Sequence, residues 1–141
     1  MVVLDTDHLS LLEQDTSETK DRLQARLQSA GGSRLVTTIV SFEEQTRGWL
    51  GRVAAARTLA AQVDAYRKLN RHLDTYRAIE VLDFDERASA EFQRLRQAHI
   101  RIGTMDLKIA AIVLAHNATL LTRNRRDFGK VPGLNVEDWT I

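Results

Sequence analysis

The chain has 141 residues, of which 43% are hydrophobic and 28% charged, and its net charge is +1. This composition is typical of one soluble globular domain, so we expect a single domain over residues 1–141. The chain contains no cysteine, which excludes disulfides and thiolate metal sites. The apolar start is too short for a signal peptide, and no apolar run approaches the ~18 residues that span a membrane, so we expect a cytoplasmic protein without a membrane partner.

Charge is distributed unevenly along the chain although the net charge is small. Residues 5–21 hold six acids against one lysine, whereas arginines dominate two later regions. A local excess of positive charge attracts polyanions such as nucleic acid, although solvated helix faces are the commoner explanation. The arginines concerned are Arg47, Arg52, Arg57, Arg67, Arg71 and Arg77 in the first region, and Arg123, Arg125 and Arg126 in the second.

Four segments rich in β-branched and aliphatic residues read as strands, and Val136 lies in a candidate fifth. The four are residues 2–4, 34–40, 78–84 and 118–122. Helical patterns fill the segments between the strands. Residues 9–28 are expected to form two helices, with Thr16 or Ser17 capping the second. Further helices are expected from Ser41, as a helical hairpin within 52–78, and over 86–99 and 105–117. Strands that alternate with helices predict an α/β fold with a mostly parallel sheet of four or five strands, covered on both faces.

Acidic and amide residues occupy equivalent positions near the ends of these strands. They are Asp5 after the first strand, Glu44 past the second, Asp106 at the start of the helix before the fourth, and Asn124 and Asp127 after the fourth. Functional groups collect beyond the carboxyl ends of parallel strands, so we expect the fold to bring these residues together. Clustered carboxylates resist ionising together unless a cation neutralises them, and Mg²⁺ or Mn²⁺ suits oxygen ligands. Phosphodiester hydrolysis fits such a site.

Each of these residues also has a purely structural explanation. The sequence from Ser41 to Glu44 fits a capping box, in which the Glu44 carboxylate reaches back to the Ser41 amide. Structural roles also suit the remaining residues: caps of the first helix for Asp5 and Asp7, a favourable helix-dipole position for Asp106, and a further cap for Asn124 with Asp127. Any one acid is therefore weak evidence, and their shared placement at strand ends carries the prediction.

Three stretches of the sequence carry a family resemblance. They are VLDTDHLS at 3–10, TTIVSFEEQTRG at 37–48 and RIGTMDLKIAAIVLAHNATLLTRNRRDFGKVPGLNVEDW at 101–139. Together they resemble the PIN-domain ribonucleases of bacterial toxin–antitoxin pairs, the VapC group. The third stretch is long and specific, whereas the opening acid motif alone would be weak.

The resemblance implies a three-layer α/β/α sandwich with an inserted helical hairpin, and a Mg²⁺- or Mn²⁺-dependent endoribonuclease that cleaves structured RNA in transfer or ribosomal RNA loops. It implies Asp5, Glu44 and Asp106 as core acids, with Asp127 as the fourth catalytic carboxylate. In that scheme Asp5 and Asp106 hold the metal, Asp127 or Asn124 completes its shell, and Glu44 orients or deprotonates water. The implied protein partners are a cognate antitoxin and a second copy of the chain.

The resemblance also assigns supporting roles around these acids. Residues expected to arrange the site are Thr6, Asp7 and Thr122, and those expected to hold flanking RNA phosphates are Arg123, Arg125 and Arg126. His8 is expected on a helix surface, and Trp49 and Trp139 in packing contacts.

Two other classes of function compete with the nuclease. One is a non-catalytic RNA-binding protein on the same fold. The other is a phosphatase that uses Asp5 or Asp7 as its nucleophile, for which the chain lacks a convincing lysine motif.

Overall fold

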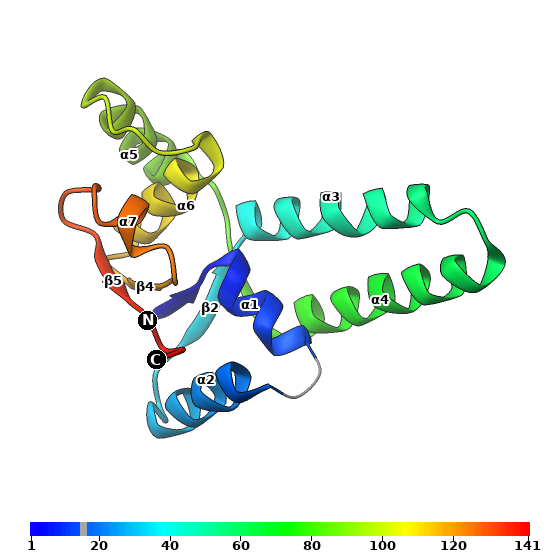
Figure 1. The fold of residues 1–141 in the computed structure, drawn as a ribbon. Helices are drawn as coiled ribbons and strands as arrows, with labels where there is room; N and C mark the ends of the chain where they lie inside the picture. Colours follow the sequence, from blue (N-terminus) through cyan, green and yellow to red (C-terminus); the bar gives the residue numbers. More distant parts are fainter. Residues whose placement is uncertain (15–16) are drawn as a thin grey trace.

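The computed structural model describes residues 1–14 and 17–141, and this part of the chain forms five strands and seven helices. In chain order they are β1 (Val2–Leu4), α1 (Thr6–Glu13), α2 (Glu18–Ser29), β2 (Leu35–Thr38), α3 (Ile39–Ala55), α4 (Leu59–Ala78), β3 (Glu80–Leu82), α5 (Glu86–Gln97), α6 (Thr104–Ala115), β4 (Thr119–Leu121), α7 (Arg125–Phe128) and β5 (Asn135–Glu137). Figure 1 shows the sheet at the centre of the fold, with α5 and α6 on one side and α2 on the other.

The five strands form one parallel sheet in the order β3-β2-β1-β4-β5. The central strand is β1, whose Val3 is in register with Val36 of β2 and with Leu120 of β4. All carboxyl ends therefore lie at the same edge. The segments that follow β1, β2 and β4 are neighbours there although they are far apart in the sequence.

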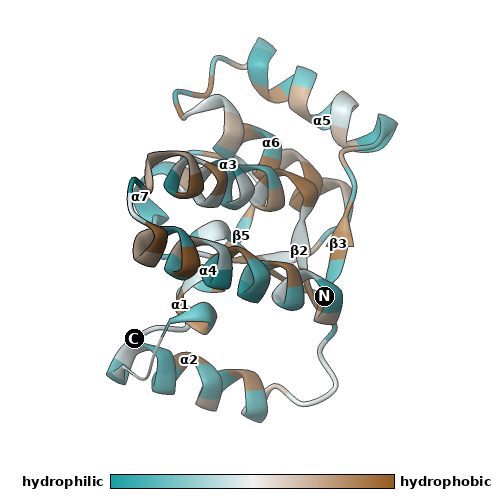
Figure 2. Cartoon of the chain, turned by 90° about the vertical axis from the view of Figure 1, so that its right-hand side faces the viewer, coloured by the Kyte–Doolittle hydropathy of each residue, from teal (hydrophilic) through white to brown (hydrophobic). Residues whose placement is uncertain are grey.

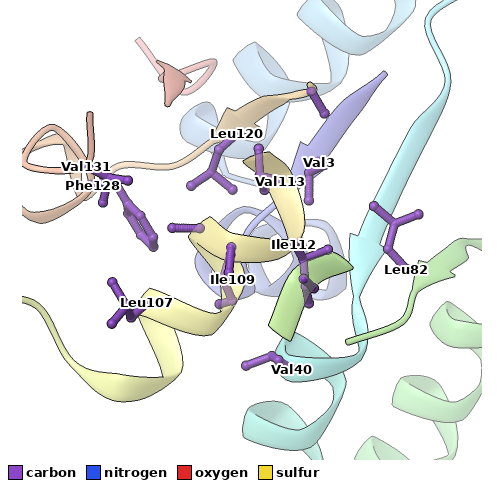
Figure 3. Close-up of a cluster of buried hydrophobic side chains, with 14 of the residues drawn as sticks. Val3, Val40, Leu82, Leu107, Ile109, Ile112, Val113, Leu120, Phe128 and Val131 are labelled. Carbon is purple, nitrogen blue, oxygen red and sulfur yellow. The ribbon is translucent and has the colours of Figure 1, made fainter. Parts of the chain in front are cut away.

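Alternate residues of β1 point to opposite faces and build two cores. Val3 belongs to the larger core with Val36 and Leu120, and Figure 3 shows it beside the α6 residues Ile112 and Val113. The second core lies on the other face and consists of Val2, Leu4, Leu11, Leu23, Leu121 and Trp139. Helices thus cover both faces of the sheet, which confirms the expected three-layer sandwich.

Helix α6 is buried on almost every side. Seven of its residues are buried, including Ile109 and Ile112, and α5 packs along it. A helix that is apolar all round has to lie inside the protein, and this explains the long apolar stretch after Gly103. The burial of the helix fixes the position of its first turn, which carries Asp106.

Helices α3 and α4 form the expected hairpin and project from the sheet as an antiparallel pair (Figure 1). The hairpin expected within residues 52–78 was placed wrongly, because that segment holds the end of α3 and the single helix α4, and α3 itself supplies the first arm. Helix α3 begins at Ile39 rather than at the expected Ser41. Thr38 provides the N-cap, since its hydroxyl accepts a hydrogen bond from the Ser41 amide at 3.0 Å. Figure 2 shows hydrophilic and hydrophobic residues alternating along α4, whereas α2 is largely hydrophilic.

The first strand has the expected bounds, whereas β2, β3 and β4 are shorter than their sequence patterns suggested. The strand expected at 34–40 ends at Thr38, while the candidate fifth strand around Val136 is confirmed as β5. Ser17 caps α2 through Lys20, whereas Thr16 lies outside the described residues. Within residues 1–14 and 17–141, we find no helix with the length and apolar character required to cross a bilayer.

The contrast between core and hairpin surface can be tested by truncation. We expect Ile112→Ala to lower the free energy of unfolding by about 2–5 kcal/mol, because the side chain is fully buried in the larger core. Leu50→Ala is the matched control, since Leu50 is 52% exposed on α3. Urea unfolding followed by circular dichroism measures both, and equal losses would contradict the assignment of the core.

Candidate active site

A small cavity of about 170 Å³ lies at the carboxyl edge of the sheet and is lined by residues from four separate segments. Asp5 and Asp7 come from the β1–α1 junction, Glu44 from α3, Asp106 from α6 and Asn124 from the loop after β4. Thr6, Ile109 and Phe128 complete the lining. The structure therefore brings together most of the residues that the sequence pointed to, including three carboxylates expected to be catalytic.

Asp5 is both a helix cap and a member of this cavity. Its Oδ1 accepts a hydrogen bond from the His8 amide at 2.8 Å, and its own amide donates to the Leu121 carbonyl at 3.1 Å. The residue is 6% exposed. The capping explanation is thus correct but does not compete with a site role, because capping occupies Oδ1 and leaves the second carboxylate oxygen, Oδ2, for another partner.

Glu44 does not act as the capping-box residue that its spacing from Ser41 suggested. Its Oε1 instead accepts a hydrogen bond from the Thr6 hydroxyl at 2.9 Å, which connects α3 to the start of α1. Burial raises the pKa of Glu44, and the charges of Asp106 and Asp5 raise it further, while the Thr6 hydrogen bond acts in the opposite direction.

Asp106 lies in the first turn of α6, where the helix dipole favours a negative charge. Burial nevertheless raises the pKa of the Asp106 carboxyl, and the negative charges of Asp127 and Asp5 add to the rise. The carboxylates of the cavity therefore oppose one another's ionisation.

Asn124 and Asp127 form the cap of the short helix α7. The Asn124 side chain accepts from the Asp127 amide at 3.4 Å and donates to the Asp127 Oδ2 at 3.1 Å. The hydrogen bond from Asn124, together with Lys130, lowers the pKa of Asp127. Asn124 lines the cavity, whereas Asp127 is not among the lining residues and acts on Asp106 through its charge. The Asp127 assignment as fourth catalytic carboxylate stays a prediction.

Asp7 and Arg123 form a bidentate ion pair at the mouth of the site. The Arg123 Nη2 donates to the Asp7 Oδ1 at 3.0 Å, and its Nε donates to Oδ2. This pair directs Asp7 toward the loop after β4, which fits a supporting role. Arg125 and Arg126 are exposed on α7 nearby, in positions that leave both side chains open to solvent.

Buried hydroxyls hold the strand ends that carry the acids. The Thr122 hydroxyl accepts from the Asn124 amide at 2.9 Å, as expected of a residue that arranges the site. Sequence reasoning missed Thr37, whose hydroxyl donates to the Leu4 carbonyl at 2.9 Å and so fixes the strand end before Asp5. The two threonines at the end of β2 were the available signal.

His8 is fully buried, so its expected place on a helix surface was wrong. Its Nδ1 lies 3.3 Å from the Asp5 Oδ1, and its Nε2 accepts from the Trp139 amide at 3.4 Å. His8 precedes Leu11 by three residues, which places both on one face of α1, and this spacing was the available signal for burial. Trp139 itself is buried, as expected, and Trp49 is half-buried on α3.

The donor set of the cavity suits a hard divalent cation, although the side chains as placed do not form a finished site. Asp5, Glu44, Asp106 and Asn124 offer only oxygen ligands, the kind that Mg²⁺ and Mn²⁺ prefer. In the described part of the chain, no three Asp, Glu or His side chains are already close enough to hold one ion. Burial and the neighbouring carboxylates raise the pKa of Glu44 and of Asp106, and a cation bound between them would offset both effects.

The chain matches two curated relatives, each over about half of the relative's length. The chain is 37% identical to Ribonuclease VapC2 of Rickettsia felis over 65 residues, which cover 43% of this chain and 48% of the relative. It is 34% identical to the tRNA(fMet)-specific endonuclease VapC of Salmonella typhimurium over 65 residues, 43% of this chain and 49% of the relative. The chain therefore spans about half the length of the curated relatives it matches.

Solved structures match over nearly the whole chain. The structure of VapBC-1 from nontypeable Haemophilus influenzae is 25% identical with a TM-score of 0.75, and covers 100% of both chains. VapBC2 from Rickettsia felis, bound to a promoter DNA fragment, is 24% identical with a TM-score of 0.74 and covers 99% of both.

The profile of the PIN domain family matches residues 2–134, a span that contains every residue of the cavity. Since this match extends over most of the sequence and agrees with the parallel sheet and its acidic edge, the chain belongs to the PIN domain family.

Proposed function

We propose that this chain is a VapC-type toxin of a toxin–antitoxin pair, and that it acts as a divalent-metal-dependent endoribonuclease. The observation that carries the proposal is the convergence of Asp5, Glu44 and Asp106 from three separate segments on one small cavity. The names of the relatives, a ribonuclease and tRNA(fMet)-specific endonucleases, support RNA as the substrate and transfer RNA as its class. Ribosomal RNA loops are the other structured substrates we infer, because unpaired bases are accessible to side chains.

Asp5 and Asp106 would hold a Mg²⁺ or Mn²⁺ ion, with Asn124 or Asp127 completing its shell. When bound, such an ion supplies Lewis-acid stabilisation of the phosphoryl group and lowers the pKa of water. Glu44 takes a proton from the attacking water, a task for which a carboxyl with a raised pKa is the better base. The Thr6 hydroxyl holds the Glu44 carboxylate in place during this transfer.

Exposed arginines next to the cavity suit the polyanionic substrate. Arg125 and Arg126 are accessible on α7, while Arg123 is engaged with Asp7. We propose that Arg125 and Arg126 bind the phosphates that flank the cleaved bond. Arg123 binds the same phosphates when they compete with Asp7 for its guanidinium.

The hairpin supplies the surface for protein partners. Its exposed apolar residues on α4 recur at helical spacing: they are Leu59, Val63, Tyr66 and Leu73. A stripe of this kind marks a contact surface, and we propose that it forms a homodimer. A cognate antitoxin is the second partner, supported by the toxin–antitoxin complexes among the similar structures.

Substitution of the core acids tests catalysis. We expect Asp5→Asn and Asp106→Asn to abolish RNA cleavage, and Glu44→Gln to slow it by about 10²–10⁴-fold, the usual contribution of a general base. Glu18→Gln is the matched control and should cleave normally, because Glu18 pairs with Arg22 on α2 and does not line the cavity. Gel analysis of transfer RNA and ribosomal RNA incubated with Mn²⁺ or Mg²⁺ measures the rates.

Two results of that experiment would contradict the proposal. RNA binding without any cleavage by the wild-type protein would favour the non-catalytic RNA-binding protein. Release of phosphate from small phosphomonoesters, with transfer and ribosomal RNA left intact, would favour the phosphatase.

Removal of one carboxylate should also stabilise the metal-free protein. A carboxyl whose pKa is raised by folding binds more protons in the folded state, so its contribution to stability falls as the pH rises through that pKa. We expect Asp106→Asn to raise the Tm by a few degrees at neutral pH in EDTA, and the gain to vanish below the ordinary aspartate pKa of about 3.9.

Divalent ions should reverse the order of the two Tm values, so that the wild-type protein becomes more stable than Asp106→Asn. At 100 times its Kd, Mn²⁺ stabilises a protein that binds it only when folded by about 2.7 kcal/mol. We expect the wild-type Tm to rise with Mn²⁺ and the Tm of Asp106→Asn to stay unchanged. Differential scanning fluorimetry measures both, and an equal rise in the two proteins would place the ion elsewhere.

The homodimer is tested by charge placed on the α4 stripe. We expect Val63→Lys with Leu73→Lys to convert a dimer to a monomer in light scattering, because both side chains are about half exposed on one helix face. Ile141→Lys is the matched control, since Ile141 is 72% exposed at the chain end. A monomeric wild-type protein would refute this part of the proposal.

A further inference from the structure

A fully buried histidine contacts Asp5 without lining the acidic cavity. His8 lies in the first turn of α1, and its exposed fraction is 0%. Its backbone amide donates to the Asp5 Oδ1 at 2.8 Å, and its ring nitrogen Nδ1 lies 3.3 Å from the same oxygen. The mechanism proposed above uses neither this ring nor the C-terminal segment that contacts it.

The C-terminal segment presents a backbone amide to the other ring nitrogen. The His8 Nε2 accepts a hydrogen bond from the Trp139 amide at 3.4 Å. The residues on either side of Trp139 form a turn, in which the Asp138 Oδ1 accepts from the Thr140 amide at 2.8 Å and from the Thr140 hydroxyl at 2.5 Å. The Thr140 carbonyl in turn accepts from the Arg22 Nε of α2 at 2.7 Å. The segment that carries the Trp139 amide is therefore anchored beside the ring.

These contacts determine which ring nitrogen of His8 carries the hydrogen. A nitrogen that accepts a hydrogen bond has no hydrogen of its own, so a ring that accepts at Nε2 carries its hydrogen on Nδ1. The Nδ1 atom is buried and makes no hydrogen bond as placed, although the Asp5 Oδ1 lies within reach. A buried N–H without an acceptor is costly, and a carboxylate oxygen accepts more than one donor. The Asp5 Oδ1 can therefore satisfy this N–H.

Asp138 offers the ring a competing arrangement. Its Oδ1 lies 3.8 Å from the His8 Nε2, on the side where a hydrogen on that nitrogen would point to a carboxylate. The distance is too long for a hydrogen bond, and the same oxygen already accepts twice from Thr140. A hydrogen on Nε2 would also deprive the Trp139 amide of its acceptor. A hydrogen on Nδ1 alone suits both the Trp139 amide and Asp5.

We propose that His8 is a positioning residue for Asp5: its Nδ1–H donates to the Asp5 Oδ1, and the Trp139 amide fixes the tautomer that allows this. The amide and the ring of one residue then hold Oδ1, so the carboxylate does not rotate freely and Oδ2 stays available to the cavity. Carboxylates that are held by such hydrogen bonds bind an ion more tightly. The role deepens the proposed metal-dependent function and rests on it.

Nitrogen NMR of the histidine rings tests the tautomer without metal or catalysis. In ¹⁵N-labelled protein at neutral pH in EDTA, we expect the His8 ring to show a protonated Nδ1 and an unprotonated Nε2. The signals are assigned by their loss in His8→Asn. Asp138→Asn should keep this tautomer, because the Trp139 amide sets it and the new side chain still offers Oδ1 to Thr140. A hydrogen on Nε2 of the wild-type ring would overturn the proposal.

Paired variants test whether His8 acts on ion binding through Asp5. We expect His8→Leu to weaken Mn²⁺ binding by about 10–100-fold, the usual loss when a group that holds a metal ligand is removed. His8→Asn should bind nearly as tightly as the wild type, because the asparagine Nδ2 and the histidine Nδ1 are both bonded to Cγ. His8→Gln, whose N–H lies one bond further out, is a second variant with the loss expected of His8→Leu. Isothermal titration calorimetry measures the affinities.

His72→Leu is the matched control for the removal of a buried ring. His72 is 3% exposed on α4 and does not line the acidic cavity, so its loss should leave the Mn²⁺ affinity unchanged. A loss in His8→Asn as large as in His8→Leu, or no loss in either, would refute the positioning role and leave the nuclease standing. A wild-type protein with the expected tautomer that binds no Mn²⁺ would refute the metal-dependent function and leave the contact between His8 and Asp5 standing.

Discussion

The structure depends on holding several negative charges close together at one edge of a parallel sheet. Burial and mutual repulsion raise the pKa of Glu44 and of Asp106, so ionising both carboxyls costs free energy in the folded protein. Sites that bind cations are built in this way, because the ion removes the repulsion and gains affinity from it. The rigid surroundings of the acids, with β1 central in the sheet and α6 buried, keep the carboxylates from moving apart.

Much of the positioning is done by groups that also complete secondary structure. Asp5 caps α1, Thr38 caps the helix that carries Glu44, and Asn124 caps α7. Each cap satisfies backbone amides that would otherwise lack partners. A residue in such a place has one atom fixed by the backbone, so its remaining polar atoms point in a defined direction. The structural roles of these residues are therefore compatible with the chemical roles proposed for them.

The hairpin connects the acidic cavity to an exposed apolar surface. Helix α3 carries Glu44 near its start, and the Thr6 hydroxyl of α1 donates to the Glu44 carboxylate at 2.9 Å. Helix α4 packs against α3 and carries a stripe of exposed apolar residues that includes Tyr66. Two packed helices thus fix the position of this stripe relative to the acidic cavity.

The sequence by itself determined the α/β class, the parallel sheet and the acids at strand ends, because residue pattern controls secondary structure and strand connection controls which ends meet. It left open whether Glu44 caps its own helix, and it wrongly placed His8 on a helix surface. Only the tertiary structure decided these points, since Thr38 supplies the cap and Thr6 binds Glu44 across 38 positions of the chain. Burial of His8 likewise depends on Trp139, a contact that no local pattern contains. Long-range contacts of this kind override local propensity because they exist only after the chain has folded.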